Sequence, residues 1–442
     1  MKNVLEWLEA TVAKYPDKPA FSDTESSITF RQVYDIARNT GAYLVEQLGV
    51  DRTPVAVFAG RKMVTPAYFL GVVYAGRPYA PIDASLPDKR IEKILENLCP
   101  GAIVADRESR EHVESIVDEL AKAEGFDRPQ IFIAEDISRF EQVACADSNC
   151  KISESAGDAV TDSENDTDGG VVAGCAGKTD DSSRDMLAVV RRQMSMTDPL
   201  YIIYTSGSTG NPKGVMTSHL SLMTYINAYC DVMHIEESDV LGNQSPLDYI
   251  AAIRDIYLPL KTGCSTAIIP KEYFMEPNAL FDYMNDKKVS SVGWSVSAFT
   301  ILTSLGAFEE VGLKSLRKIC FSGSVMPCRV LRKWQENLPE AHFVNQYGPT
   351  EATASCTYYS VDHTVEEDEV LPIGKAYDNY RVFLIDEHGN DPAVGEQGEI
   401  CVCGPILALG YYNDPERTAA AFTLNPLNRA YPCLLYTSDA AD

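Results

Sequence analysis

Apolar and polar positions recur with two different periods over the first part of the chain. Near the N-terminus four apolar residues repeat at helical spacing: Val4, Leu5, Leu8 and Val12. This stripe predicts an amphipathic helix that ends at Pro16. Short apolar runs at 55–58 and 102–104 predict strands, and the polar-faced segment 88–97 between them predicts a helix. The alternation predicts α/β layers for residues 1–135, the first part of a large domain.

The next segment, residues 136–198, is predicted to be an acidic and largely disordered insertion. Its central part, 147–185, contains ten acidic residues, three basic residues and no aromatic residue. Such a stretch buries too little apolar surface to offset the entropy that ordering it would cost. A segment that docks a partner through its acidic residues is the alternative for the same composition.

Strand-like runs return after Pro199, so residues 199–432 are predicted to form the rest of the large domain. The strand candidates are 201–204, 266–269 and 400–403. A chain of 442 residues is long enough for two or three domains or subdomains. The α/β rhythm on both sides of the insertion therefore favours one layered α/β architecture.

The overall charge argues against polyanionic partners. Lys and Arg together number 38, whereas Asp and Glu number 64, which gives a formal net charge of -26. A field of this sign repels nucleic acid and anionic membrane surfaces, so we expect neither as a partner.

No apolar run approaches the roughly 20 residues that span a bilayer, and the N-terminal segment with Glu6 and Glu9 does not resemble an export signal. The 12 cysteines are scattered without a CxxC pair, which fits reduced thiols in a cytoplasmic protein.

The strongest chemical signal is the segment 204–214, which reads YTSGSTGNPKG directly after a strand candidate. Its glycines let a loop approach a ligand closely, its hydroxyls offer hydrogen-bond donors, and Lys213 supplies a compact positive charge. These features predict a loop that binds a polyphosphate, although the Gly-Lys-Ser/Thr ending of a Walker loop is absent. A flexible Gly/Ser turn is the alternative, but it would not specify so many positions. The residues expected to bind phosphate are Thr205, Ser206, Gly207, Ser208, Thr209, Gly210 and Lys213.

A second signal lies downstream at 345–353, which reads NQYGPTEAT. Tyr347 offers an aromatic face for a purine, Thr350 offers a hydroxyl for the α-phosphate, and Glu351 offers a hard oxygen ligand for Mg²⁺. Taken alone, the stretch is also compatible with an ordinary Gly-Pro turn that ends in a capping threonine.

Together these segments resemble the phosphate-loop signature and the adenine and metal motif of the adenylate-forming superfamily, which includes acyl-CoA synthetases, luciferases and amino-acid adenylation domains. Residues 321–324 and 371–374 resemble the segments around its adenine pocket, and the likeness extends to about Pro426. It is closest to amino-acid adenylation domains of peptide synthetases and to D-alanine-carrier protein ligases. The resemblance implies the large domain of that fold, with two α/β subdomains plus a small distorted β-barrel. The further nucleotide-binding residues that it implies are Ser322, Gly323, Asn345, Gln346, Tyr347, Gly348 and Thr350.

The implied activity is ATP-dependent activation of a small carboxylic acid, an amino acid or a related acid, as acyl-AMP with release of pyrophosphate. Thr350, Glu351 and Lys213 are the expected catalytic residues, Glu351 is the expected metal ligand, and ATP and Mg²⁺ are the expected cofactors. The acyl group would pass to the phosphopantetheine thiol of a carrier protein. An acyl-CoA ligase, or a catalytically idle nucleotide-binding module, is the alternative.

The region that would bind the acid departs from the resemblance. In the adenylation branch an aspartate pairs with the α-ammonium of the substrate, and an ungapped alignment from Asn243 places Ile250 there. Asp248, which would share its face on a strand, and Asp255 are the carboxylates nearby. Either could supply the carboxylate if the local geometry differs. Without such a partner a buried ammonium would lack its counter-charge, and an acid without an α-amine is the alternative. The substrate-binding residues that we expect are Asp248, Ile250, Gly323 and Gly374.

The end of the chain departs as well. The family continues through an element whose aspartate holds the ribose into a small domain that carries a catalytic lysine. Residues 433–442 do not match that element, although Asp439 is a distorted echo of the ribose ligand. We therefore expect 433–442 to be a foreign tail, the small C-terminal domain to be absent from this chain, and catalysis to be impaired in this form.

Overall fold

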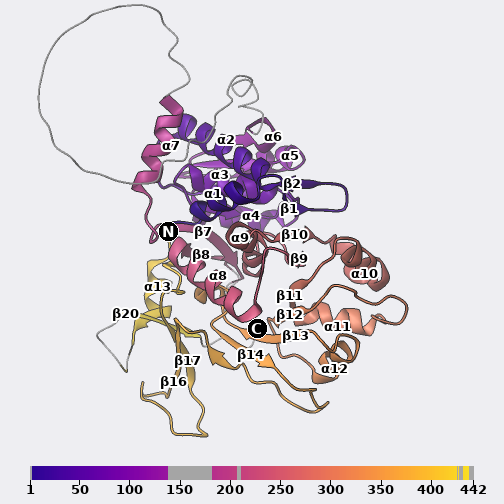
Figure 1. The fold of residues 1–442 in the computed structure, drawn as a ribbon. Helices are drawn as coiled ribbons and strands as arrows, with labels where there is room; N and C mark the ends of the chain where they lie inside the picture. Colours follow the sequence, from indigo (N-terminus) through magenta and orange to yellow (C-terminus); the bar gives the residue numbers. More distant parts are fainter. Residues whose placement is uncertain (1, 138–181, 207–210, 426, 428–431, 438–442) are drawn as a thin grey trace, which may run out of the picture.

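The computed structural model describes residues 2–137, 182–206, 211–425, 427 and 432–437, and two large β-sheets dominate it (Figure 1). Helices cover both faces of each large sheet, and a smaller sheet lies beside them. The α/β architecture predicted from the alternation of strands and helices is confirmed. No helix in these ranges has the length and apolar character needed to cross a bilayer.

The first sheet has seven strands, of which five are parallel and come from α/β units. Apolar runs such as Val55–Phe58 are buried on both faces, as expected for a covered parallel sheet. The strand candidates at 55–58, 102–104 and 201–204 all lie in it. In spatial order the strands are β18 (Gly410–Tyr411), β8 (Lys213–Ser218), β7 (Pro199–Thr205), β4 (Tyr79–Pro81), β3 (Val55–Phe58), β5 (Ala102–Ala105) and β6 (Gln130–Ile133).

The second sheet has nine strands and carries the downstream motif. Its central strands are parallel, and β14 and β15 close one edge in antiparallel fashion. The candidate at 266–269 is confirmed as one of its strands. In spatial order the strands are β15 (Lys375–Ala376), β14 (Thr357–Val361), β13 (His342–Tyr347), β12 (Lys318–Ser322), β11 (Ser291–Ser295), β9 (Val240–Asn243), β10 (Ser265–Ile268), β1 (Pro19–Ser22) and β2 (Ser27–Thr29).

Helices form three layers around these sheets because each turns an apolar stripe toward a sheet. In the helix predicted at 88–97, for example, Ile91, Ile94, Leu95 and Leu98 are buried. The layer outside the first sheet contains α4 (Asp88–Leu98) and α5 (Arg110–Leu120), and that outside the second contains α10 (Pro277–Asp286), α11 (Val296–Ser304) and α12 (Cys328–Asn337). The layer between the sheets contains α1 (Leu5–Lys14), α2 (Phe30–Leu48), α3 (Thr65–Tyr74), α8 (His219–Met233) and α9 (Ile253–Thr262).

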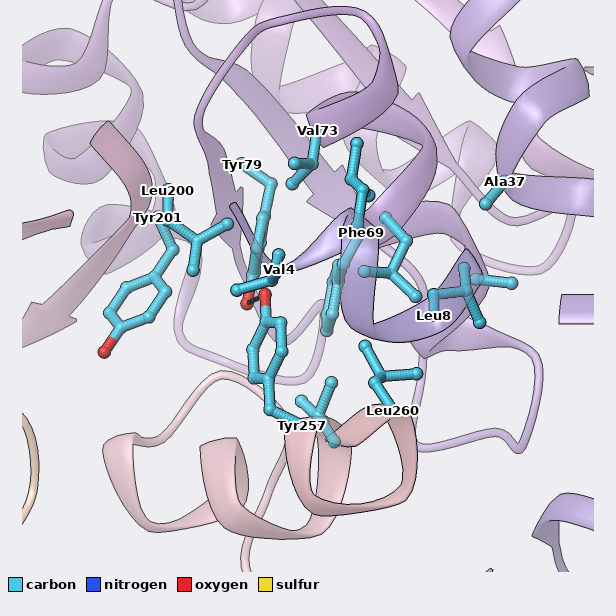
Figure 2. Packing of buried hydrophobic residues seen from close by; sticks show 14 of the residues in the cluster. Val4, Leu8, Ala37, Phe69, Val73, Tyr79, Leu200, Tyr201, Tyr257 and Leu260 are labelled. Atoms are coloured by element: carbon cyan, nitrogen blue, oxygen red, sulfur yellow. Dashed lines mark hydrogen bonds between the residues drawn. The ribbon is translucent and has the colours of Figure 1, made fainter. Parts of the chain in front are cut away.

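The largest hydrophobic core lies in this middle layer and joins the two sheets (Figure 2). Phe69 of α3 stacks on Tyr79 of β4 with ring centroids 4.5 Å apart. The Tyr79 hydroxyl in turn lies 2.9 Å from the hydroxyl of Tyr257, which belongs to α9. A buried hydrogen bond therefore connects the first sheet to a helix that packs on the second.

The resemblance implies a small distorted β-barrel, and the part of the structure that corresponds to it is a third, smaller sheet. Its four antiparallel strands are, in order, β16 (Arg381–Ile385), β17 (Glu399–Cys403), β20 (Pro432–Thr437) and β19 (Phe422–Leu424). The candidate at 400–403 is confirmed as β17. Strand β20 includes residues 433–437 of the segment that we expect to be foreign, and it pairs with β17 at Tyr436 and Cys401. The origin of residues 433–442 stays a prediction, and 438–442 lie outside the described residues.

The two ends of the predicted insertion contain helices that the sequence did not predict. Residues 138–181 lie outside the described residues, but α6 (Ala134–Ile137) runs into the start of the insertion, and α7 (Ser182–Gln193) occupies its final third. Leu187 and Val190 of α7 are buried, and a Cβ at Gly76 would lie 2.7 Å from the Val190 side chain. The Arg191 guanidinium also donates to Asn3 and Glu9. Helix α7 is therefore an ordered part of the first subdomain (Figure 1, magenta).

Candidate functional site

The structure brings the lysine of the first motif and the glutamate of the second motif into direct contact. Lys213 begins β8, and Glu351 lies in the short 3₁₀ helix η5 (Thr350–Ala352), which follows β13. The Lys213 Nζ donates to the Glu351 Oε1 over 2.6 Å. The Glu351 side chain is only 7% exposed, whereas that of Lys213 is 25% exposed. The ion pair thus lies at the boundary between the core and the solvent.

Tyr411 completes this cluster from a third segment. Its hydroxyl donates to the same Glu351 Oε1 over 2.7 Å and accepts from the Lys213 Nζ over 3.2 Å. Burial raises the pKa of the Tyr411 phenol, and the Glu351 carboxylate raises it further. The sequence resemblance included the Gly410–Tyr411 segment but assigned no role to it, because an isolated tyrosine carries no chemical pattern.

Backbone hydrogen bonds fix the three segments of the cluster. Strand β18 pairs with β8 in antiparallel fashion, with Tyr411 opposite Val215. The Ala408 N–H donates to the carbonyl of Glu351 over 2.8 Å, and the Thr353 hydroxyl donates to the carbonyl of Ile406 over 2.6 Å. The cluster therefore sits where the edge of the first sheet meets the motif strand of the second.

The phosphate-loop motif begins, as predicted, at the end of a strand. Thr205 is the last residue of β7 and lies opposite Lys213 in the β7–β8 pair. The Thr205 Oγ1 is buried and has no hydrogen-bond partner among the described residues, while Ser206 is exposed. Such an unpaired hydroxyl beside Lys213 suits a ligand with acceptor oxygens. The remaining predicted residues Gly207, Ser208, Thr209 and Gly210 lie outside the described residues.

The second motif forms the end of β13 and the turn after it. The Asn345 amide donates to the carbonyl of Pro372, and the Gln346 amide donates to the Tyr377 hydroxyl over 2.6 Å. Gly348 is required sterically, because a Cβ there would lie 2.5 Å from the Cα of Ser355. Tyr347 is half-buried next to this turn. Thr350 begins η5 beside Glu351, so two of the three expected catalytic residues are neighbours on one turn.

The other expected nucleotide-binding residues lie on the adjacent strand and the turn that follows. Ser322 ends β12, which runs parallel to β13, so their carboxyl ends meet at one edge of the sheet. Gly323 has a φ of 95° and would have no atom near an added Cβ, which leaves open space beside it. Gly374 has a φ of 82°, and its Cβ would lie 2.0 Å from the carbonyl oxygen of Tyr358. Only glycine fits position 374.

The three positions considered for the acid differ in their surroundings. A turn, in which the Tyr249 N–H donates to the Pro246 carbonyl, carries Asp248, so the expected strand alternation with Ile250 is wrong. Burial raises the pKa of Asp248, and the nearby Asp83 raises it further. Ile250 is buried in the main core.

Asp255 is buried in α9 and accepts a hydrogen bond from the Asn243 amide over 2.8 Å. Burial raises its pKa to about 6. Asp248 and Asp255 therefore have different neighbours, and the structure does not bring them together with Ile250 as one recognition group.

Sequence reasoning missed Arg254, which precedes Asp255 in α9. Its guanidinium contacts Gln346 of the second motif over 3.4 Å. A single arginine in a helix gives no sign from sequence that it will be buried.

No group of three or more His, Cys, Asp or Glu side chains suited to a metal ion occurs within the described ranges. A cation at Glu351 would therefore need oxygen ligands from a bound molecule as well. Within the same ranges, no hydrogen bond is made to the Glu351 Oε2, because both donors use Oε1. One carboxylate oxygen thus remains available for a hard cation, and the expected metal role fits the residues present.

Known proteins with similar sequences and folds cover almost the whole chain. D-alanine--D-alanyl carrier protein ligases of Bacillus cereus (strain Q1) and Bacillus thuringiensis (strain Al Hakam) are 28% and 29% identical over 430 residues, which is 97% of this chain and 75% of each relative. The fold resembles that of the nonribosomal peptide synthetase FmoA3, with a TM-score of 0.77 and 22% identity over 99% of this chain and 41% of that one. It also resembles the Klebsiella oxytoca NpsA N-terminal subdomain, with a TM-score of 0.74 and 18% identity over 99% of this chain and 96% of that one.

These likenesses agree with the resemblance that the two motifs carry. The AMP-binding enzyme family matches residues 8–412 of this chain, a range that includes Lys213, Glu351 and Tyr411. The resemblance inferred from the motifs is confirmed. The chain belongs to the AMP-binding enzyme family.

Proposed function

We propose that the chain uses MgATP to convert a small carboxylic acid into acyl-AMP and pyrophosphate. In this reaction a carboxylate oxygen attacks the α-phosphorus, and the bond from that phosphorus to the oxygen bridging it to the β-phosphate breaks. The observation that carries the proposal is the Lys213–Glu351 ion pair, because it holds a cation that suits phosphate oxygens next to a carboxylate that suits a metal ion. Positive charge stabilises a transferring phosphoryl group, and Lys213 would supply it directly while Glu351 would supply it through a bound metal ion.

Each residue of the cluster has a role in this proposal. Lys213 and the Thr205 hydroxyl bind the β- and γ-phosphates, and Thr350 donates to an oxygen of the α-phosphate. Tyr347 supplies a face for the adenine, and Ser322 with Gly323 lines the space beside it. The Tyr411 hydroxyl holds the Glu351 carboxylate in place through its 2.7 Å hydrogen bond. Most of the rate enhancement from these residues would come from positioning and charge neutralisation.

Mg²⁺ would be held by the Glu351 Oε2 together with phosphate oxygens of the nucleotide. When bound, it would neutralise charge on those oxygens. Lys213 now donates to Glu351, and phosphate oxygens would compete for this lysine. Binding of the nucleotide is therefore expected to weaken the Lys213–Glu351 ion pair and to leave the Glu351 carboxylate available to the cation.

The proposed acceptor of the acyl group is the phosphopantetheine thiol of a carrier protein. The thiol sulfur would attack the acyl carbon, and AMP would leave. This assignment is supported by the names of the relatives, which are carrier protein ligases and a nonribosomal peptide synthetase. The FmoA3 structure includes a form with AMPPNP, and NpsA was determined with 3-hydroxybenzoyl-AMSN.

The test measures nucleotide binding by calorimetry and acid-dependent exchange of labelled pyrophosphate into ATP, using the full chain and a panel of carboxylic acids. We expect exchange only with Mg²⁺ and with a subset of the acids. Lys213→Ala should weaken binding of ATP and pyrophosphate by about 1–3 kcal/mol and weaken AMP binding less. If the variant loses the same affinity for AMP as for ATP, Lys213 does not bind the β- and γ-phosphates. A chain that binds no nucleotide would contradict the proposed function, and transfer to CoA rather than to a carrier protein would change the acceptor only.

A further inference from the structure

Arg254 is a fully buried cation without a carboxylate partner. Its side chain is 1% exposed, and no ion pair to it forms within the described part of the chain. The adjacent Asp255 is close enough to interact with Arg254 electrostatically, but its carboxylate accepts a hydrogen bond from Asn243 and not from this guanidinium. By comparison Arg77, the other arginine among the largest fully buried side chains, forms an ion pair with Asp51 and donates to three carbonyl oxygens.

The hydrogen bonds of Arg254 leave donor capacity unused. Its Nη2 donates to the Gly293 carbonyl over 2.7 Å, and its Nη1 has only longer contacts, at 3.4 Å to the Gln346 Oε1 and at 3.7 Å to the Cys320 Sγ. The Arg254 Nε has no hydrogen-bond partner in the described residues. Burial raises the pKa of the nearby Tyr225 phenol, and the Arg254 charge lowers it. The Arg254 Nε is therefore a fully buried donor that no described residue uses.

The guanidinium lies on the site-facing side of the second sheet. Gly293, Cys320 and Val344 are aligned across three parallel strands, so their side chains share one face. Gln346 is two residues beyond Val344 and Ser322 two residues beyond Cys320, so both lie on that face roughly 7 Å nearer the carboxyl ends of the strands. Arg254 thus lies just beneath the residues expected to line the nucleotide and acid sites.

The sheet is shaped to accommodate this arginine. A Cβ at Gly293 would lie 2.8 Å from the Arg254 Cζ, so any larger residue there would displace the guanidinium. Burying a charge that has no hydrogen-bonded counter-charge is costly, and an apolar side chain of similar volume would avoid that cost. A cation at this position is therefore expected to bind an anionic group of a ligand.

We infer that Arg254 binds a second carboxylate of the acid that the chain activates, at the end remote from the carboxylate that reacts with ATP. The substrate class is then a dicarboxylic acid or an acid with an acidic side chain. This inference rests on the proposed function and adds the chemistry of the substrate to it. Ile250 provides no carboxylate for an amine, whereas Arg254, one helical turn later, provides a cation. Because the guanidinium is covered, side chains between it and the ends of β12 and β13 have to move as the acid enters.

The experiment compares the binding of acyl-sulfamoyl-adenosine analogues whose acyl chains end in a methyl, a carboxamide or a carboxylate group, over a series of matched lengths. Calorimetry with the full chain measures each Kd, so no turnover is needed. At one length at least, the carboxylate-ended analogue should bind about tenfold or more tightly than its methyl- and carboxamide-ended counterparts. Arg254→Met should lose this preference and retain binding of the methyl-ended analogue. Arg77→Met, a matched buried arginine far from the motif strands in the sequence, should keep the preference.

The outcomes separate the two proposals. If ATP and some analogues bind but the carboxylate-ended ones have no advantage at any length, the inference about Arg254 is wrong and the proposed function stands. A preference that persists in Arg254→Met also overturns it. If neither ATP nor any analogue binds, both proposals fail. Should Arg254→Met not fold, the preference of the unmodified chain still decides, and Arg254→Lys, which keeps the charge, should retain part of it.

Discussion

At the scale of single residues, one carboxylate oxygen organises the candidate site. The Glu351 Oε1 accepts from both Lys213 and Tyr411, which come from positions 138 and 60 residues away in the sequence. The two motifs predicted the lysine and the glutamate from their residue types, but they could not predict that the two would touch. The contact depends on how two sheets meet, and no local pattern encodes that.

Glu351→Gln tests the metal role of this carboxylate. The neutral amide keeps an oxygen that can accept from Tyr411, so the fold should be retained, but an amide is a poor ligand for a hard cation. We expect Mg²⁺-dependent pyrophosphate exchange to fall by about 10² or more. Glu340→Gln, at an exposed position, is the control and should exchange normally. Unchanged Mg²⁺ dependence in the Glu351 variant would show that another group holds the metal.

Asp255 gives a prediction about pH. Burial raises the pKa of this carboxyl from 3.8 to about 6 in the folded chain. Since the folded state then holds the proton more tightly than the unfolded state, Asp255 costs nothing below about pH 4, and the folded state loses stability as the pH rises toward and through 6. The loss is of the order of 3 kcal/mol. Asp255→Asn should flatten this step in urea denaturation series, whereas Asp127→Asn on the surface should leave it. An unchanged step would place the titrating group elsewhere.

At the scale of elements, the strands with strong apolar runs were predictable, and one helix was not. The runs at 55–58 and 400–403 agree with β3 and β17 to within one residue. Helix α7 was missed because the acidic composition of residues 147–185 dominated the interpretation. Leu187, Val190 and Met194 nevertheless follow a helical 3–4 spacing, and all three are buried. That spacing was the available signal.

Val190→Asp tests whether α7 belongs to the fold. Val190 is 3% exposed and packs on Gly76, so a charge there should destabilise the chain by about 3 kcal/mol or more. Its neighbour Val189 is 36% exposed, so Val189→Asp should cost no more than about 0.5 kcal/mol. Both values come from chemical denaturation. Similar losses in the two variants would mean that α7 does not pack as described.

At the scale of the whole molecule, the chain does not fill the two sheets in sequence order. Strands β1 and β2 from the first 135 residues join the second sheet, whereas β7, β8 and β18 from beyond residue 198 join the first. The predicted boundaries at 135 and 199 therefore do not separate two structural bodies. Strand partners are set by long-range contacts, so the sequence could not predict this exchange. The exchange is what brings β8 and β18 to the site.

The Tyr79–Tyr257 hydrogen bond tests how the layers hold together. Tyr257→Phe leaves the buried Tyr79 hydroxyl unpaired and should cost about 1–3 kcal/mol of unfolding free energy. Removing both hydroxyls, in Tyr79→Phe with Tyr257→Phe, should restore most of that loss, because no polar group is then left unpaired. A double-mutant cycle in urea measures the coupling. If the two single losses simply add, the hydroxyls do not support one another.

The position of Tyr411 also sets the order of events during synthesis. Lys213 leaves the ribosome 198 residues before Tyr411, which at typical elongation rates is roughly 10 to 40 s earlier. Throughout that interval β8 has no β18 at its edge, and Glu351, once made, lacks its tyrosine. A nascent chain can therefore fold most of both sheets before Tyr411 completes the proposed phosphate and metal site. Nucleotide can act as a folding ligand for the complete site only after Tyr411 has been made.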